Sequence, residues 1–238
     1  LRRQPCDDVP RGGGIAVALE RSGTKKVCAR MSDPSPETLT FVFTDLESST
    51  RLWEKFPDAM KAAVERHDAI LSDAIESSAG RVVKVMGDGL MAVFFSAPDG
   101  VRACLDAQRM LNVEAWGETG PLRVRMGLHA GAAQPRGGDF YGPPVNRAAR
   151  IMAAGHGGQV LLSAHVAELA GDRLPAGAGL RDLGDHRLKD LSQPERIFQL
   201  GDDDFLPLKS LHRTNLPIPA TAFLGREREP QVLKAAQY

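Results

Sequence analysis

Two aspartates, Asp45 and Asp88, each follow an apolar run with the composition of a β-strand. The runs are residues 40–44 and 82–86, and each aspartate lies in a short turn lined by glycine or hydroxyl residues. A single aspartate at such a place ordinarily caps a helix or forms a turn. Two carboxylates at the ends of neighbouring strands would instead supply hard oxygen ligands for Mg²⁺, with loop amides nearby for phosphates. The pair therefore predicts a magnesium–phosphate site.

Asn146 and Arg150 lie four residues apart, so they project from one face of a helix. An exposed arginine on a polar helix face is the usual outcome of this spacing. A guanidinium fork can also hold a phosphoryl oxygen while an amide orients a hydroxyl group. Three further charged residues, Lys84, Asp139 and Lys189, would each be interpreted as surface charges if taken alone.

Hydrophobic periodicity places these residues on a regular series of elements. Strands are expected at residues 39–44, 81–86, 90–95, 122–128, 159–163, 180–188 and 196–200. Helices are expected at residues 48–56, 58–77, 98–113, 143–154 and 164–170, with a glycine-rich loop before Gly142. The Gly87–Gly89 turn indicates a hairpin, which breaks strict alternation of strand and helix. The order predicts an α/β sandwich with a ferredoxin-like βααββαβ core, in which helices cover a mostly antiparallel sheet.

Composition indicates a globular protein: of 238 residues, 42% are hydrophobic and 25% are charged. Lys plus Arg and Asp plus Glu both number 30, so the formal net charge is +0. This balance argues against direct nucleic-acid binding and against a polybasic membrane patch. No apolar run approaches the roughly 20 residues of a membrane span. Cys6, Cys28 and Cys104 match neither a disulfide framework nor a zinc site, and a cytoplasmic protein is expected.

Three regions follow from changes in composition along the chain. Residues 1–37 are expected to be a disordered leader, because prolines and glycines interrupt any periodicity, and Met31 is expected to be the natural start. Residues 38–200 are expected to form the domain that carries the chemistry. Residues 201–238 return to a linker that is rich in aspartate and proline.

Together, the charged positions resemble the catalytic domain of class III nucleotidyl cyclases, of the bacterial type found in front of signal-transduction ATPase or regulator domains. The resemblance covers residues 39–200 and keeps the family's order and spacing. The matching positions are Asp45, Lys84, Asp88, Asp139, Asn146, Arg150 and Lys189. Residues 214–229 are similar to the start of the ATPase domain found behind such cyclases, and the phosphate-binding loop that would follow is absent, so the start of a truncated second domain is expected.

The resemblance implies an adenylate cyclase, which converts ATP to 3′,5′-cyclic AMP and pyrophosphate. Asp45, Leu46 and Asp88 would bind two Mg²⁺ or Mn²⁺ ions, which activate the ribose 3′-hydroxyl and polarise the phosphates. Asn146 would orient the ribose. Arg150 would stabilise the charge that develops on the α-phosphate.

The resemblance also implies how ATP is recognised. Lys84 would contact N1 and Asp139 the 6-amino group of adenine, because guanine presents the opposite donor pattern. Lys189 would contact the β- and γ-phosphates. The loop that cradles the triphosphate through its amides would consist of Leu46, Glu47, Ser48, Ser49 and Thr50. A homodimer is implied, in which one subunit supplies the metal aspartates and the other the purine-, ribose- and transition-state-binding residues.

Three alternatives stay open on sequence alone. A guanylate cyclase is disfavoured by Lys84 and Asp139, since guanylate-specific relatives typically carry Glu and Cys-like residues there. A diguanylate cyclase would account for the Gly-Gly-Asp139-Phe run, but it lacks an expected acidic residue and leaves Asn146 and Arg150 unexplained. A catalytically silent cyclase-homology domain that binds nucleotide and regulates an attached domain typically loses a metal aspartate or the Asn–Arg pair, and neither is missing here.

Overall fold

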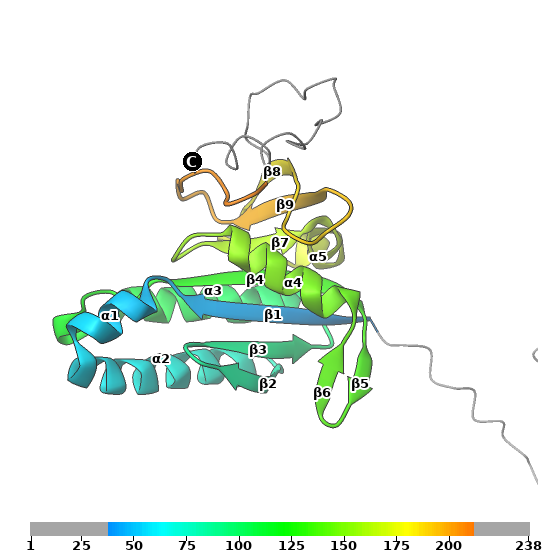
Figure 1. Ribbon diagram of the computed structural model, residues 1–238. Coiled ribbons are helices and arrows are strands. Elements are labelled where there is room, and N and C mark those ends of the chain that lie inside the picture. The colour runs from blue at the N-terminus through cyan, green and yellow to red at the C-terminus, as the bar shows by residue number, and fades with distance from the viewer. Residues whose placement is uncertain (1–37, 212–238) are drawn as a thin grey trace, which may run out of the picture.

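A seven-stranded sheet forms the centre of the computed structural model, which describes residues 38–211 (Figure 1). The strand order is β2-β3-β1-β4-β7-β9-β8, and only β4 and β7 are parallel neighbours. The strands are β1 (Thr38–Leu46), β2 (Arg81–Met86), β3 (Gly89–Phe94), β4 (Val124–Ala132), β7 (Val160–Ser163), β8 (Leu180–His186) and β9 (Glu195–Leu200). A separate hairpin of β5 (Gln134–Arg136) and β6 (Asp139–Tyr141) extends beside the end where β1 begins (Figure 1).

Helices cover both faces of this sheet. One face carries α2 (Pro57–Ser77), α3 (Ala97–Val113) and α5 (Ala164–Ala170), and the other carries α4 (Pro143–Ala154). The short helix α1 (Ser49–Lys55) joins β1 to α2, and two 3₁₀ turns lie at Gly117–Thr119 and Gly171–Arg173. The mostly antiparallel sheet covered by helices confirms the predicted fold class.

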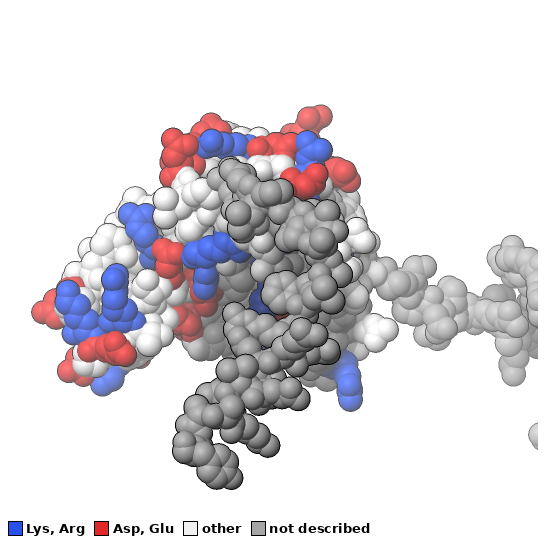
Figure 2. Space-filling model, turned by 45° about the horizontal axis from the view of Figure 1, so that its top comes forward, with Lys and Arg blue, Asp and Glu red and all other residues white. Residues whose placement is uncertain are grey.

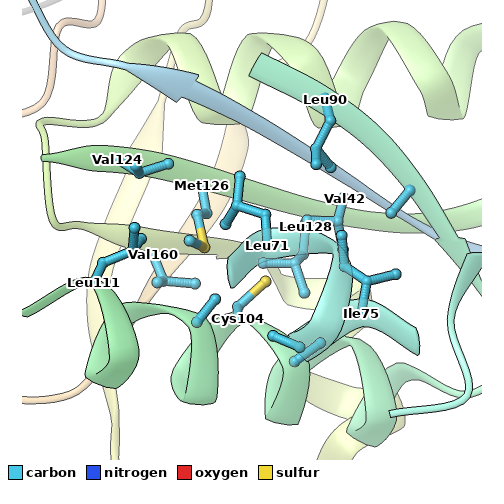
Figure 3. Packing of buried hydrophobic residues seen from close by; sticks show 14 of the residues in the cluster. Val42, Leu71, Ile75, Leu90, Cys104, Leu111, Val124, Met126, Leu128 and Val160 are labelled. Atoms are coloured by element: carbon cyan, nitrogen blue, oxygen red, sulfur yellow. The ribbon is translucent and has the colours of Figure 1, made fainter. Parts of the chain in front are cut away.

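The main core lies between the sheet and α2, α3 and α5. Figure 3 shows Leu71 and Ile75 of α2 and Cys104 of α3 packed against strand residues such as Val42 and Met126. The buried positions of α2 recur three or four residues apart, which is the pattern of an amphipathic helix. Each fully buried aliphatic side chain contributes about 1.5–3 kcal/mol, so this layer is a principal source of stability.

A second cluster packs β1 and β3 against α4, and it includes Phe41, Phe43 and Val145. Gly127 of β4 allows the helix to approach closely, because a β-carbon there would lie 2.6 Å from Cα of Met152. The backbone of α4 therefore rests directly on β4. This packing fixes the position of the helix that carries Asn146 and Arg150.

Most predicted elements are present, and the differences have local causes. The glycine-rich loop contains the β5–β6 hairpin, whose turn uses positive φ values at Gly137 and Gly138. The strand predicted at 122–128 continues to Ala132, because its last residues pair with the start of β1. Asp45 was expected in a turn and instead lies inside β1, opposite Arg125.

Other predictions concern the chain ends and the surface. The expected leader at 1–37 with its start at Met31, and the ATPase-like segment at 214–229, lie outside the described residues. Residues 201–211, expected to be a linker, contain no helix or strand but pack against the sheet. No helix within residues 38–211 has the length and apolarity needed to cross a membrane. On the face shown in Figure 2, acidic and basic side chains are interspersed.

Candidate active site

Asp45 and Asp88 lie at adjoining ends of neighbouring strands. β1 pairs with β3 up to Phe43 and Met91, and continuing this antiparallel register brings the Gly87–Gly89 turn beside Asp45. A β-carbon on Gly89 would lie 3.2 Å from Cα of Asp45 and would collide with the carbonyl oxygen of Thr44. The structure therefore brings the two aspartates together at one corner of the sheet.

The carboxylate oxygens at this corner are suitable ligands for a divalent cation. Asp88 Oδ2 is buried and has no hydrogen-bond partner among the residues that the structure describes. No group of three or more His, Cys, Asp or Glu side chains within residues 38–211 is arranged to hold a metal. Two carboxylates would thus leave the remaining positions to backbone oxygens, water and substrate phosphates, the ligand set that Mg²⁺ prefers.

Arg125 is a residue at this corner that the sequence analysis passed over. Its Nε donates to Asp45 Oδ2 at 2.8 Å, and Nη2 donates to the same oxygen. Both contacts of the arginine go to one carboxylate oxygen of Asp45, and neither goes to the other. The signal was present in the sequence, since Arg125 is a charged residue on a half-buried strand, but only the register of β1 and β4 places it opposite Asp45.

The segment after Asp45 forms a tight turn into α1. Leu46 is buried, Ser48 and Thr50 are exposed, and the Glu47 amide donates to the Arg123 carbonyl at 2.9 Å. Ser48 adopts a left-handed conformation with φ 61°, which costs about 1–3 kcal/mol for a residue other than glycine. Such strain is common where a loop binds a ligand, and Ser49 then begins the helix.

Glu47 is ionised within this turn. Burial raises the pKa of its carboxyl group, but hydrogen bonds from Lys209 and from the Gly157 amide, together with the charges of Lys209 and His156, outweigh that effect. The net result is a pKa below the ordinary value for glutamate. A negative charge therefore sits on the turn that is expected to bind phosphates, with a lysine as its partner.

Lys84 and Asp139 meet although 55 residues separate them in the sequence. Lys84 Nζ lies 2.5 Å from Asp139 Oδ2, and the side chains are 38% and 21% exposed. The hydrogen bond from Lys84, followed by that from the Phe140 amide, lowers the pKa of Asp139. The β5–β6 hairpin makes this contact possible by bringing Asp139 over β2. The pair thus presents a hydrogen-bond donor and a hydrogen-bond acceptor side by side, and both remain accessible to a ligand.

The exposed face of α4 carries the third group of predicted residues. Arg150 Nη2 lies 2.6 Å from Asp190 Oδ2, and Lys189 is exposed next to Asp190 in the turn after β8. Asn146 is exposed one helical turn before Arg150. Arg147, between them, turns the other way and pairs with Glu195 of β9 at 3.2 Å. Asp190 thus brings Arg150 and Lys189 into one neighbourhood.

The Lys84–Asp139 pair and the metal-binding corner lie on different strands of the sheet. Lys84 of β2 is opposite Met91 of β3, and Met91 is opposite Phe43 of β1, so the pair is level with Phe43 and two strands away from β1. Asp139 reaches Lys84 from the β5–β6 hairpin. One chain therefore presents a metal-binding corner at Asp45 and, across β3, a pair of residues that is expected to face the base.

Comparison with known proteins identifies the family of this chain. The family model described as "Adenylate and Guanylate cyclase catalytic domain" matches residues 31–189. An uncharacterized protein of Mycobacterium tuberculosis is 39% identical over 233 residues, which cover 94% of this chain and 77% of the relative. The adenylate cyclase of Lachancea kluyveri is 35% identical over 155 residues, which cover 55% of this chain and 8% of that much longer protein.

Solved structures show the same similarity. A Trypanosoma brucei adenylate cyclase in its monomeric state has a TM-score of 0.67 at 27% identity, covering 73% of this chain and 94% of the other. The adenylyl cyclase CyaB from P. aeruginosa has a TM-score of 0.61 at 25% identity, covering 70% and 95% of the two chains. The chain therefore belongs to the adenylate and guanylate cyclase catalytic domain family, the class III nucleotidyl cyclases.

Proposed function

We propose that this protein is an adenylate cyclase that converts ATP to 3′,5′-cyclic AMP and pyrophosphate. The observation that carries the choice of nucleotide is the contact between Lys84 and Asp139. An ammonium donor beside a carboxylate acceptor matches adenine, whose N1 accepts and whose 6-amino group donates a hydrogen bond. Guanine presents a carbonyl and an N–H at these places. On binding, the adenine edge replaces the direct contact between the two side chains.

The phosphate chemistry is assigned to the corner around Asp45 and to α4. Asp45, Asp88 and Leu46 would hold Mg²⁺ or Mn²⁺, two ions per site, which when bound favour ionisation of the 3′-hydroxyl and neutralise phosphate charge. The turn at residues 46–50 would bind the triphosphate through its amides, except that of Glu47, which donates to the Arg123 carbonyl. Lys189 would contribute a further positive charge. Little covalent work falls to the protein in phosphoryl transfer, so positioning and electrostatics dominate.

Stabilisation of the transition state is assigned to Asn146 and Arg150. The 3′-oxygen attacks the α-phosphorus in line with the departing pyrophosphate, so one P–O bond forms while another breaks. Arg150 offers a planar, permanently charged fork to the α-phosphate oxygens, where charge develops. Asn146, one helical turn earlier, hydrogen-bonds the ribose and orients the attacking hydroxyl group.

Membership of the adenylate and guanylate cyclase family supports a composite site in a homodimer. In this arrangement the metal corner of one copy would face the Lys84–Asp139 pair and the helix α4 of the other copy. Two-fold symmetry then generates two equivalent sites per dimer. Each site takes Asp45 and Asp88 from one subunit and Lys84, Asp139, Asn146 and Arg150 from the other.

The activity is tested by product formation from the purified chain. The unaltered protein is incubated with Mn²⁺ and ATP, and separately with Mn²⁺ and GTP, and cyclic nucleotides are quantified by mass spectrometry. We expect cyclic AMP from ATP, little cyclic GMP, and no product from Asp45→Ala. Nucleotide binding without product would identify a silent regulatory domain, and dominant cyclic GMP would identify a guanylate cyclase.

The composite site is tested by mixing two inactive variants. Asp45→Ala and Asn146→Ala each disable a different half, so a mixed dimer has one intact and one doubly defective site. Random mixing makes half of the dimers mixed, which predicts recovery of about a quarter of the unaltered activity. Differently tagged chains verify that mixed dimers form. No recovery from verified mixed dimers would contradict the shared-site arrangement.

A further inference from the structure

Residues 205–211, termed here the C-terminal strap, connect three segments that carry predicted site residues. The Lys209 amide donates to the Ala154 carbonyl at 2.9 Å, at the end of α4. The Leu211 amide donates to the Arg187 carbonyl at 2.9 Å, just before the turn that carries Lys189. Lys209 Nζ lies 3.2 Å from Glu47 Oε1 in the turn after Asp45. The strap is also the part of the chain through which residues 212–238 are attached.

The strap is anchored by apolar packing as well as by hydrogen bonds. Leu208 packs on a buried cluster that contains Ile151 of α4 and Leu188 beside the Lys189 turn. The Pro207 carbonyl lies 3.1 Å from His156 Nε2, directly beyond the end of α4. Lys209 follows these anchors in the chain, so its main-chain position is set before its side chain reaches Glu47.

Glu47 in turn has little freedom to move. Its amide is held by the Arg123 carbonyl, and its side chain lies against Gly157, where a β-carbon would come within 2.7 Å of Glu47 Oε2. The carboxylate is thus confined between a glycine backbone and the lysine of the strap. Loss of the lysine would free the side chain and leave an uncompensated negative charge beside the turn that binds the triphosphate.

We propose that Lys209 is a positioning residue for nucleotide binding, which holds the phosphate-binding turn through Glu47 and ties that turn to the end of α4. This inference rests on the proposed function, because the ligand of the turn is taken to be the triphosphate of ATP. Lys209 does not touch the substrate. Its contribution is expected in the affinity for metal–ATP rather than in the rate of the chemical step, since neither Asn146 nor Arg150 contacts it.

The experiment uses the full 238-residue chain with Lys209→Ala, Lys209→Arg and Lys209→Glu. Lys61→Ala is the matched control, because Lys61 forms an exposed ion pair with Asp58 at 3.1 Å on α2. Because Lys209 is also exposed, its removal should raise the KM for Mn²⁺–ATP by about three- to fivefold. Charge reversal places two carboxylates together and should raise it about tenfold or more. We expect kcat within about twofold in each case, and near-normal KM for Lys209→Arg and Lys61→Ala.

Hydrogen exchange of the peptide that spans residues 46–50 provides a readout that needs no activity. We expect faster exchange in Lys209→Ala and Lys209→Glu, and restored protection in Lys209→Arg. An unaltered chain that makes no cyclic AMP would refute the proposed function, while the exchange rates would still decide the role of Lys209. The positioning role of Lys209 would be overturned if Lys209→Glu left both the exchange rates and the KM unchanged. A fall in kcat with KM unchanged would also overturn it.

Discussion

The buried histidine of β4 makes the stability of the fold depend on pH. His129 is 5% exposed, and its Nδ1 lies 2.8 Å from Ser163 Oγ. Burial, together with the charges of Arg147 and His165, lowers the pKa of His129 from 6.5 to about 4. Folding therefore favours the neutral imidazole. Glu195 nearby behaves in the opposite way, because burial raises the pKa of its carboxyl group despite the opposing charges of Arg147 and His165.

The sign and size of the effect follow from linkage. Between pH 6.5 and pH 4 the unfolded chain binds a proton at His129 that the folded chain does not, so stability falls as the pH falls. The difference of 6.5 − 4 = 2.5 pH units corresponds to about 3 kcal/mol when fully expressed. Roughly 2 kcal/mol of this is lost between pH 7.5 and pH 5. Glu195 offsets part of it, so the effect must be isolated by comparison with a variant.

The variant is His129→Gln, which can still hydrogen-bond Ser163 but does not titrate. Urea unfolding at pH 7.5 and pH 5 gives the change in unfolding free energy for each protein. We expect the unaltered protein to lose about 2 kcal/mol more than the variant over this range. His165→Gln removes only the smaller contribution of that exposed charge, and it should keep most of the pH dependence because burial is the main cause of the lowered pKa of His129. Equal losses in the unaltered protein and His129→Gln would refute the reasoning.

Three further predictions follow from the site and the core. Arg150→Ala or Asn146→Ala should lower kcat by about two orders of magnitude or more with a much smaller change in KM, measured by steady-state kinetics, and a loss of only a few-fold would contradict the transition-state role. Gly89→Ala should lower the unfolding free energy by about 1–3 kcal/mol or more in urea titrations, because the new methyl group meets the Thr44 carbonyl. Gly179→Ala serves as the control for the contact, because a β-carbon there would lie 3.6 Å from the nearest atom, Asp202 Oδ1. Burial raises the pKa of Cys104 to about 12, so peptide-level mass spectrometry should show no alkylation of this thiol at pH 8 until urea unfolds the protein.

Elements with a strong local signal could be predicted from the sequence. The helices α2 and α4 have apolar residues at helical spacing, a proline at the start and small or polar residues at the end, and both were placed within a residue of their bounds. The Gly87–Gly89 turn fixed the β2–β3 hairpin in the same way. These signals lie within a few residues of one another, so no knowledge of the tertiary structure is needed.

The contacts that complete the site could not be predicted in this way. Arg125 meets Asp45 only because β1 and β4 pair in one register, and a shift of one residue would turn it to the other face. The β5–β6 hairpin is only three residues long on each side, too short for an alternating pattern. Lys209 reaches Glu47 across 162 residues of sequence. Such long-range pairs depend on the whole topology, which local patterns do not encode.

The charged residues of the candidate site pair with one another in the structure, and this bears on how the proposed substrate, ATP, would be bound. Asp45 pairs with Arg125, Asp139 with Lys84, and Arg150 with Asp190. An unpaired charge at a partly buried site would carry a desolvation cost that paired charges avoid. In the proposed mechanism, binding would exchange one partner for another: adenine would separate Lys84 from Asp139, and phosphate would compete with Asp190 for Arg150. Because each exchange would replace an existing contact, little charge interaction would be gained in the ground state. Most of the gain would arise in the transition state, in which the charge on the α-phosphate would exceed what a carboxylate offers to Arg150.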